Sequence, residues 1–363
     1  YGYLGQYEKA LPYFEESLKI VKELNIHLNI ARIIDNIGYI NLYRRRYKEA
    51  EEIFYESAKE IQKAGRRYRG QSGLVEVYLA TEKPESALGI LKEVVPGWNA
   101  PTPLRSAFHT LHGLALKGVG QLKESSYEFL KAVSLTEEMR QKVKERADFM
   151  SAGFAGGRIR AYKGLVSSLS ERALNGETTD SEFANYGKDI PSNAFYFSES
   201  TKARTLLESI AESARRYNEQ ELPLSLRTKE QDILNQLSAI EEHWEETYKK
   251  GEQAFKELQE RKENLKKEFD TLLSEIRKDY PKYAALKYPR PILAEELPLK
   301  DNEVLLEYAI DDKAAYLFKV KKGGVQKIIK ISKGKEDLEA QINEFMLPLQ
   351  SQYTREDFSS EKG

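Results

Sequence analysis

The sequence contains no cysteine among its 363 residues. Disulfide bonds, thiolate metal sites and a cysteine nucleophile are therefore excluded within this chain. There is no apolar run of the ~18 residues that a membrane-spanning helix needs, and no signal peptide is visible. With 57 basic and 58 acidic residues, the net charge gives no reason to expect nucleic acid or a lipid surface as a partner. We expect no cofactor, no membrane association and a cytoplasmic location.

The clearest pattern in the chain lies between Tyr39 and Phe54. Apolar residues recur there at steps of three and four on both sides of the basic triplet Arg44–Arg46. This spacing predicts two helices, each with one apolar face, joined by a tight turn. Similar units recur at intervals of roughly 37–40 residues, which is typical of stacked helical repeats. A small residue holds the same place in each unit: Ala10, Ala50, Ala87 and Ser125.

Further residues recur around these small positions, most completely in the second unit. That unit has Asn36-Ile37-Gly38, Tyr47, Ala50, Phe54 and Ser57-Ala58; the first has Gly5, Tyr7, Ala10, Phe14 and Ser17; the fourth has Gly113, Gly120, Leu122, Ser125, Phe129 and Ala132. In order and spacing these residues resemble the tetratricopeptide (TPR) repeat. The resemblance implies an α-solenoid of helix pairs that approach closely at small residues and are filled by aromatic ones. The chain opens partway through such a unit, so we expect it to be a piece of a longer protein.

The rest of the chain divides by composition and periodicity. Past Pro223, apolar residues repeat along two narrow, highly charged stretches separated by Gly251, which favours a long antiparallel helical hairpin over the alternative of one unbroken helix. We therefore expect a mostly α fold with five segments. They are TPR-like repeats at 1–180, a connecting helix at 181–222, the hairpin at 223–290, a small α/β segment at 291–350 and a disordered tail at 351–363.

The pattern changes to strands near the C-terminus. Short apolar runs at Glu303–Ile310, Ala314–Val320 and Val325–Ile331 are separated by turn residues, and an amphipathic helix is expected at Lys335–Leu347. Three strands and one helix are too few to bury both faces of a sheet. We therefore expect a domain that begins near Ile292 and is incomplete.

Two short segments extend the resemblance to nearly the whole chain. Ser198–Glu208 reads Ser-Glu-Ser-x-Lys-Ala-Arg-x-Leu-Leu-Glu, and Leu305–Tyr308 reads Leu-Leu-Glu-Tyr. Following the repeats, this succession resembles the TPR–CHAT family, in which a caspase-like cysteine-protease (CHAT) domain follows a TPR array. The family places its catalytic histidine and cysteine after later strands, so no catalytic residue can be assigned here. The resemblance implies the regulatory arm and opening strands of such a protease, with the remaining part of the CHAT domain as a partner.

The first helix of each TPR-like pair is expected to line a concave groove. In the register of the repeats, the groove residues are Arg32, Asp35, Tyr39, Tyr43, Arg69, Ser72, Glu76, Leu79, His109 and Lys117. This mixture of charged and aromatic side chains suits an extended peptide or a helix of a partner protein. The sequence thus predicts partner recognition that controls proteolysis. The alternative is a non-enzymatic TPR adaptor for protein assembly.

Three other motifs have a more ordinary interpretation. His109 and His112 could face one way as metal ligands, but packing or groove lining is favoured. Gly153–Arg158 resembles a phosphate-binding loop, yet it lacks a preceding strand and the Gly-Lys-Ser/Thr ending. The basic clusters Arg44–Arg46 and Arg66–Arg69 have aromatic neighbours and could contact RNA or another acidic partner, although solvated turns between helices are favoured.

Overall fold

The computed structural model describes residues 7–65, 71–93, 102–142, 158–202, 222–243, 247, 250–288 and 291–352. Most of these residues are helical, and one small antiparallel sheet lies near the C-terminal end. The predicted mostly α fold is thereby confirmed. The chain divides into two compact units, Tyr1–Ala161 with Ala214–Ala284 and Tyr162–Ser213 with Ala285–Gly363. Each unit is described by itself.

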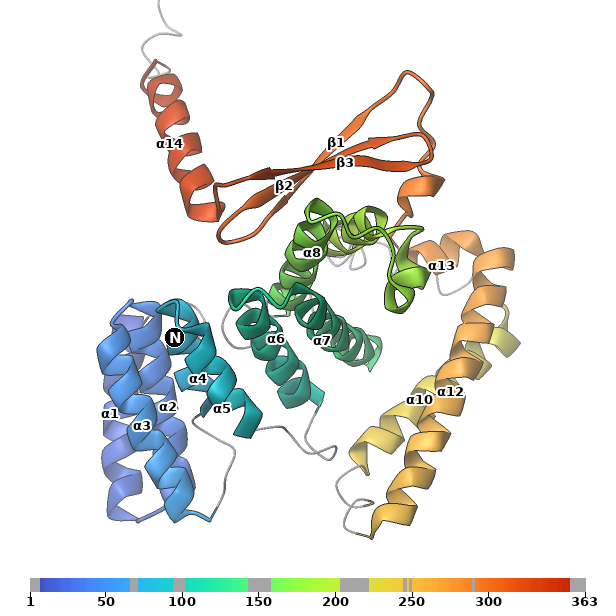
Figure 1. Ribbon diagram of the computed structural model, residues 1–363. Coiled ribbons are helices and arrows are strands. Elements are labelled where there is room, and N and C mark those ends of the chain that lie inside the picture. The colour runs from blue at the N-terminus through green and yellow to red at the C-terminus, as the bar shows by residue number, and fades with distance from the viewer. Residues whose placement is uncertain are drawn as a thin grey trace, which may run out of the picture. The chain divides into compact units, whose positions relative to one another are not determined.

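The first unit begins with consecutive antiparallel helices (Figure 1). They are α1 (Tyr7–Glu23), α2 (His27–Tyr43), α3 (Tyr47–Lys63), α4 (Gln71–Ala80), α5 (Pro84–Glu93), α6 (Thr102–Gly118) and α7 (Leu122–Lys142). Each helix packs against the next, and the first helices α2, α4 and α6 also contact one another in sequence. This is the arrangement of side-by-side helix pairs that the repeat pattern predicts.

The turns between these helices share one backbone feature, a residue with a positive φ angle. Asn25, Arg45, Glu82 and Gly120 each have a positive φ, which ends the preceding helix in the left-handed conformation. After Arg45, for example, the amide of Arg46 donates to the carbonyl of Asn41 over 2.9 Å. The predicted turn at Arg44–Arg46 is therefore a short helix C-cap, repeated along the chain.

Phe54 fixes the distance between neighbouring helices. Its side chain is fully buried, and a Cβ atom built on Gly38 would come within 2.7 Å of its ring. A Cβ atom on Gly73 of α4 would also clash with the same ring. In the fourth repeat, a Cβ atom built on Gly113 would likewise come within 2.9 Å of the Phe129 ring. Glycine at these places thus leaves the volume that the aromatic ring fills, as the repeat pattern predicts.

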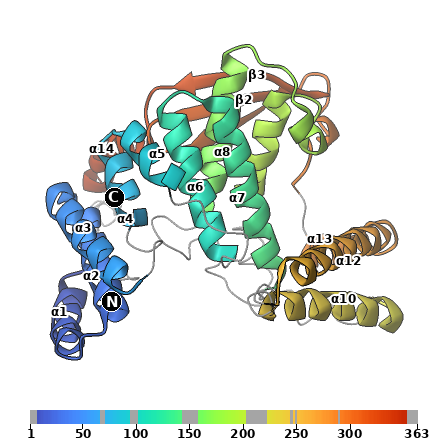
Figure 2. The ribbon, with the colours of Figure 1, turned by 60° about the horizontal axis from the view of Figure 1, so that its bottom comes forward.

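The first unit also contains the expected helical hairpin. Its arms are α10 (Leu224–Glu242) and α12 (Glu252–Asp279), which lie side by side in Figures 1 and 2. Gln236 accepts a hydrogen bond from Arg261, and Lys229 lies 3.9 Å from Glu268, so the arms run antiparallel. Gly251 has a φ of 120° immediately before α12, which rules out one unbroken helix at that point.

Glu138 of α7 links the hairpin to the repeats. This glutamate is buried and accepts hydrogen bonds from Lys262 and, over 2.9 Å, from Lys266, both on α12. Because an unpaired buried carboxylate is costly, the two lysines hold α12 against the end of the repeat array.

In the second unit, helices cover one face of the sheet. The helices are the main part of α8 (Ile159–Leu174), a short 3₁₀ helix (Ser181–Tyr186), a helix whose described part covers residues 190–202, a second 3₁₀ helix (Ala294–Glu296) and α14 (Lys335–Gln352). The strands are β1 (Leu305–Ile310), β2 (Ala315–Lys321) and β3 (Gly324–Ile331). The strands form an antiparallel meander in the order β1-β2-β3. Their ends lie within two residues of the predicted ones.

Alternate residues of β2 form the core of this unit. Tyr316, Phe318 and Val320 are buried, and the Phe318 ring lies 6.1 Å from that of Phe195. The hydroxyl of Tyr316 donates to Glu171 of α8 over 2.6 Å. One face of the sheet is therefore sealed by α8 and by the helix at residues 190–202.

Several expectations differ in their boundaries. The segment expected as repeats at 1–180 includes α8, and residues 143–157 before this helix lie outside the described residues. The segment at 181–222, expected as a connecting helix, begins with the 3₁₀ helix Ser181–Tyr186. Helix α14 continues to Gln352, and the rest of the expected tail, 353–363, lies outside the described residues.

Candidate functional site

The exposed surface of α2, α4 and α6 is the candidate binding site, hereafter the first-helix face. The three helices are successive neighbours, so their outward side chains form one continuous surface. Arg32, Tyr43 and Ser72 are exposed on it. The side chains of Asp35, Leu79 and Lys117 are partly exposed, and Arg69 lies outside the described residues.

Tyr39 is buried beneath this face. Its ring packs edge-on against Phe54 with 5.1 Å between ring centres, and its hydroxyl lies 3.3 Å from the Ser72 hydroxyl. Burial and the nearby carboxylate of Glu76 raise the pKa of Tyr39 well above its ordinary value. The side chain therefore joins α2 to α4 and offers little surface to a partner.

Glu76 is also buried, and Arg160 neutralises it. One guanidinium nitrogen of Arg160, from the first turn of α8, lies 2.7 and 2.9 Å from the two carboxylate oxygens. A buried carboxylate needs such a partner, because removal from water without one costs several kcal/mol. The pair is separated by 84 residues in sequence, and no local pattern identifies it.

His109 belongs to a polar cluster between α6 and α7. Its Nδ1 lies 2.6 Å from Glu128, the Nδ1 of His112 lies 3.2 Å from the same carboxylate oxygen, and Lys131 reaches the other oxygen over 2.8 Å. Burial opposes ionisation of Glu128, but these three hydrogen bonds outweigh it and hold the pKa well below its ordinary value. The cluster ties the two helices together, which agrees with the packing role favoured for the histidines.

The second unit contains a different polar cluster, between the helix at residues 190–202 and β1. The hydroxyl of Ser198 donates to the buried carboxylate of Glu307 over 2.6 Å, and Lys202 lies 3.0 Å from the same oxygen. Burial, together with the hydrogen bond to Glu307 and its charge, raises the pKa of Glu199 to about 8. The Glu199 carboxyl is therefore largely protonated at neutral pH and can donate a hydrogen bond to Glu307.

This cluster joins the two segments on which the CHAT resemblance rests. Ser198, Glu199 and Lys202 belong to the Ser-Glu-Ser-x-Lys-Ala-Arg segment, and Glu307 is the glutamate of Leu-Leu-Glu-Tyr. The sequence analysis selected both segments but did not predict their contact, because more than a hundred residues separate them.

The remaining motifs give no further site. The triplet Arg44–Arg46 forms the turn between α2 and α3, whereas residues 66–69 and 153–157 lie outside the described part of the chain. Among the described residues, no group of three or more His, Asp or Glu side chains is arranged to hold a metal ion. No helix in the same part of the chain is long and apolar enough to cross a membrane.

Comparison with known proteins gives a match at the start of the chain. Residues 1–63 match the family model described as Tetratricopeptide repeat. This match covers α1 to α3 and the pair in which the repeat pattern is most complete. No curated protein matches the chain. TPR repeats generally bind protein partners, so the matched region indicates a role in protein–protein interaction.

Proposed function

We propose that this chain is the regulatory, partner-binding part of a TPR–CHAT caspase-like protease, whose repeats hold a protein or peptide on the first-helix face. The observation that carries the binding part is the surface exposure of Tyr43, Arg32 and Ser72 on neighbouring first helices. Tyrosine and arginine are the residues that most often dominate binding energy at protein interfaces.

The side chains on the first-helix face favour a partner that has both acidic and apolar residues. Tyr43 is 43% exposed and offers an apolar ring with a polar tip, while Arg32 and Lys117 offer positive charges that can pair with carboxylates. On the central helix of this surface, Arg160 neutralises the buried carboxylate of Glu76. A peptide or helix with alternating acidic and apolar residues fits such a surface.

A pull-down experiment with a matched control tests this assignment. Tyr43→Ala is the test variant, and Tyr55→Ala is the control, because Tyr55 is exposed to a similar extent (47%) on the second helix α3. We expect partner recovery to fall at least tenfold for Tyr43→Ala and to stay within twofold for Tyr55→Ala. Equal recovery with both variants would remove the first-helix face from the proposal. Tyr39→Ala is unsuitable, because its buried ring supports the fold.

The protease part of the proposal is supported by the contact between Ser198 and Glu307. The two segments that resemble the family are hydrogen-bonded in one unit, as expected of parts of one domain. The test is to read the coding sequence past the codon for Gly363. A histidine and a cysteine after further predicted strands are expected there. Their absence would end the protease proposal and leave the binding proposal standing.

The second candidate is a non-enzymatic adaptor. It is favoured by the lack of any cysteine in the chain and by the TPR match. In this case the pull-down with Tyr43→Ala still loses the partner, whereas no histidine and cysteine are found in the downstream sequence. The two experiments together therefore separate the candidates.

A further inference from the structure

The sheet of the second unit has one face that no described element covers. On β1 the buried Glu307 alternates with Leu306, Tyr308 and Ile310, which are 54%, 49% and 42% exposed. An antiparallel sheet with one solvated face normally places polar residues there. We call this apolar surface the outer sheet face.

The apolar side chains continue across the strands. Tyr308 pairs with Leu317 of β2, which pairs with Ile329 of β3, so the three side chains form one row across the sheet. Ile329 is 40% exposed. The next row has Leu306 beside Lys319 and Lys327. Contiguous exposed apolar surface of this kind marks a place where another element docks.

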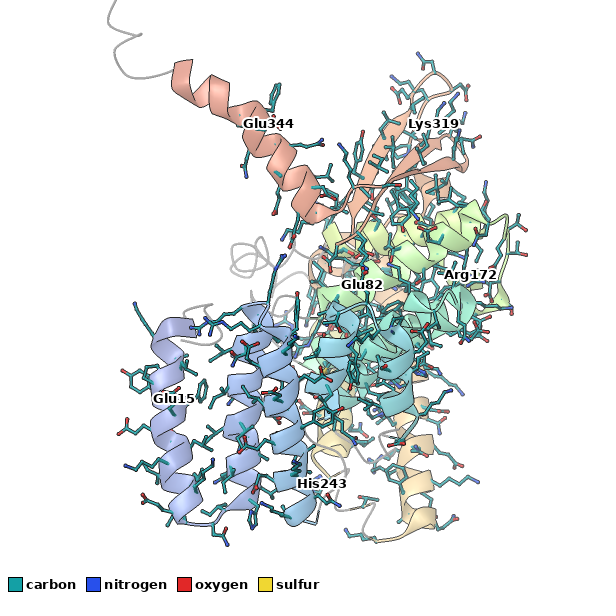
Figure 3. The ribbon with its side chains drawn as sticks, turned by 60° about the vertical axis from the view of Figure 1, so that its left-hand side comes forward. Glu15, Glu82, Arg172, His243, Lys319 and Glu344 are labelled. Atoms are coloured by element: carbon teal, nitrogen blue, oxygen red, sulfur yellow. The ribbon has the colours of Figure 1, made fainter. Side chains whose placement is uncertain are left out.

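Helix α14 has an exposed apolar stripe of its own. Leu338, Ile342 and Phe345 follow at steps of four and three, and so lie on one side of the helix. Ile342 and Phe345 are 59% and 70% exposed. In this structure α14 extends away from the sheet, and Figure 3 shows Glu344 of α14 apart from Lys319 of β2.

The charges of the two surfaces are complementary. Helix α14 carries four acidic residues: Glu336, Asp337, Glu339 and Glu344. On the outer sheet face, Lys319 of β2 and Lys327 of β3 lie in the row of Leu306. Two other lysines of this region already have acidic partners: Lys330 pairs with Glu171 and Lys322 with Asp301. An acidic amphipathic helix therefore suits an apolar face that carries Lys319 and Lys327.

The length of α14 matches that of β3, and the connection between them is short enough for the helix to pack on the sheet. Helix α14 has 18 residues, about 27 Å, and β3 has 8 residues, about 26 Å. Three residues, Ser332 to Gly334, connect them, within the usual range for a strand followed by a helix that packs on the sheet. Gly334 packs against the β1–β2 turn, and the amide of Lys335 donates to Asp311 over 3.1 Å, so the helix already starts at the end of the sheet.

We propose that α14 docks on the outer sheet face of its own chain and that the open position seen here is the other state of a switch. Antiparallel to β3, Ile342 lies about 10 Å from the start of the helix, level with the row of Tyr308, Leu317 and Ile329. Docking covers both apolar surfaces at once. Opening exposes Ile342 and Phe345 as an amphipathic helix that another protein can bind.

Introduced cysteines test the register, because the full chain has none of its own. The pair Leu317→Cys with Ile342→Cys places both sulfur atoms in the proposed interface. The control pair Leu317→Cys with Ala340→Cys moves the second cysteine to the opposite side of the same helix. After mild oxidation, we expect at least tenfold more intrachain disulfide from the first pair, measured by mass spectrometry of the peptides.

Three outcomes overturn the proposal. Equal yields from the two pairs show a helix that moves freely and does not dock. A disulfide between two chains shows that the outer sheet face receives a second copy. No disulfide from either pair shows that α14 does not reach the face, or that another partner covers it.

Hydrogen exchange of the cysteine-free chain provides a second measurement that does not depend on cross-linking. Ile342→Asp removes the apolar contact, whereas Ala340→Asp is the matched change on the other side of the helix. We expect at least tenfold faster exchange of the α14 amides in Ile342→Asp than in Ala340→Asp. The same rate in both variants contradicts docking.

Discussion

The close contact between glycine and Phe54 predicts opposite effects of the same substitution at two positions. In Gly38→Ala, the new Cβ atom lies 2.7 Å from the Phe54 ring, which is itself fully buried. In Gly89→Ala, on α5, the new Cβ atom meets nothing within 4 Å. Both glycines lie inside helices and neither has a positive φ, so the helical preference of alanine acts equally on both.

The two effects have different signs. Alanine in place of glycine inside a helix stabilises by about 1 kcal/mol. Overpacking of a close-packed core costs about 1–3 kcal/mol. For Gly38→Ala, we therefore expect a net loss of up to about 2 kcal/mol, and for Gly89→Ala a gain of about 1 kcal/mol, so that the two variants differ by about 1–3 kcal/mol.

The assay is urea denaturation followed by circular dichroism at the helical band. The double variant Gly38→Ala with Phe54→Leu should recover part of the stability that Gly38→Ala loses, beyond what the single variants add up to, because the two side chains are in contact. If Gly38→Ala is as stable as Gly89→Ala, Phe54 does not set the spacing of the helices, and the packing argument is refuted.

Two further predictions concern buried charges. Arg160→Met leaves the Glu76 carboxylate buried without its partner and should destabilise the first unit by about 3 kcal/mol in urea titrations, whereas adding Glu76→Gln should restore much of that loss. Glu199 has a pKa raised from 4.5 to about 8, so its contribution to stability is complete below 4.5 and is lost as the pH rises through 8. Glu199→Gln should therefore be more stable than the parent at pH 9 by about 1–2 kcal/mol, after allowance for solvent screening, and similar to it near pH 4.5 in thermal melts.

Local patterns were sufficient to predict most of the elements. These elements depend on residues that are close together in the sequence. Examples are the turn at Arg44–Arg46, the break between the hairpin arms at Gly251 and the three strands. Spacing of apolar residues and turn chemistry report on such local structure. The end of α14 was placed too early at Leu347: Pro348 follows, and a helix usually ends at the residue before a proline, yet α14 continues to Gln352.

Long-range pairings could not be read from the sequence. The register of the repeats placed Tyr39 and Glu76 on first helices, but their burial depends on Ser72, Phe54 and Arg160 in other helices. Periodicity assigns a residue to a face of its own helix and does not say what packs against that face. For this reason the exposed members, such as Tyr43, are better candidates for binding than the buried ones.

The same limit applies to the polar clusters. His109 and His112 were recognised as a pair, yet the carboxylate between them comes from Glu128 on the following helix. Glu199 and Glu307 meet only because the strand packs against a helix far away in sequence. In each cluster, the local sequence does not indicate which other helix or strand supplies the partner of a given side chain.

The most direct measurement of the binding proposal is photo-cross-linking from single positions of the full chain. A photoreactive phenylalanine analogue is placed at Tyr43 on the first-helix face or at Tyr55 on α3, and cross-linked peptides of the captured partner are identified by mass spectrometry. The account predicts a single partner segment linked from position 43 and little or none from position 55. Cross-links only from position 55 would contradict it.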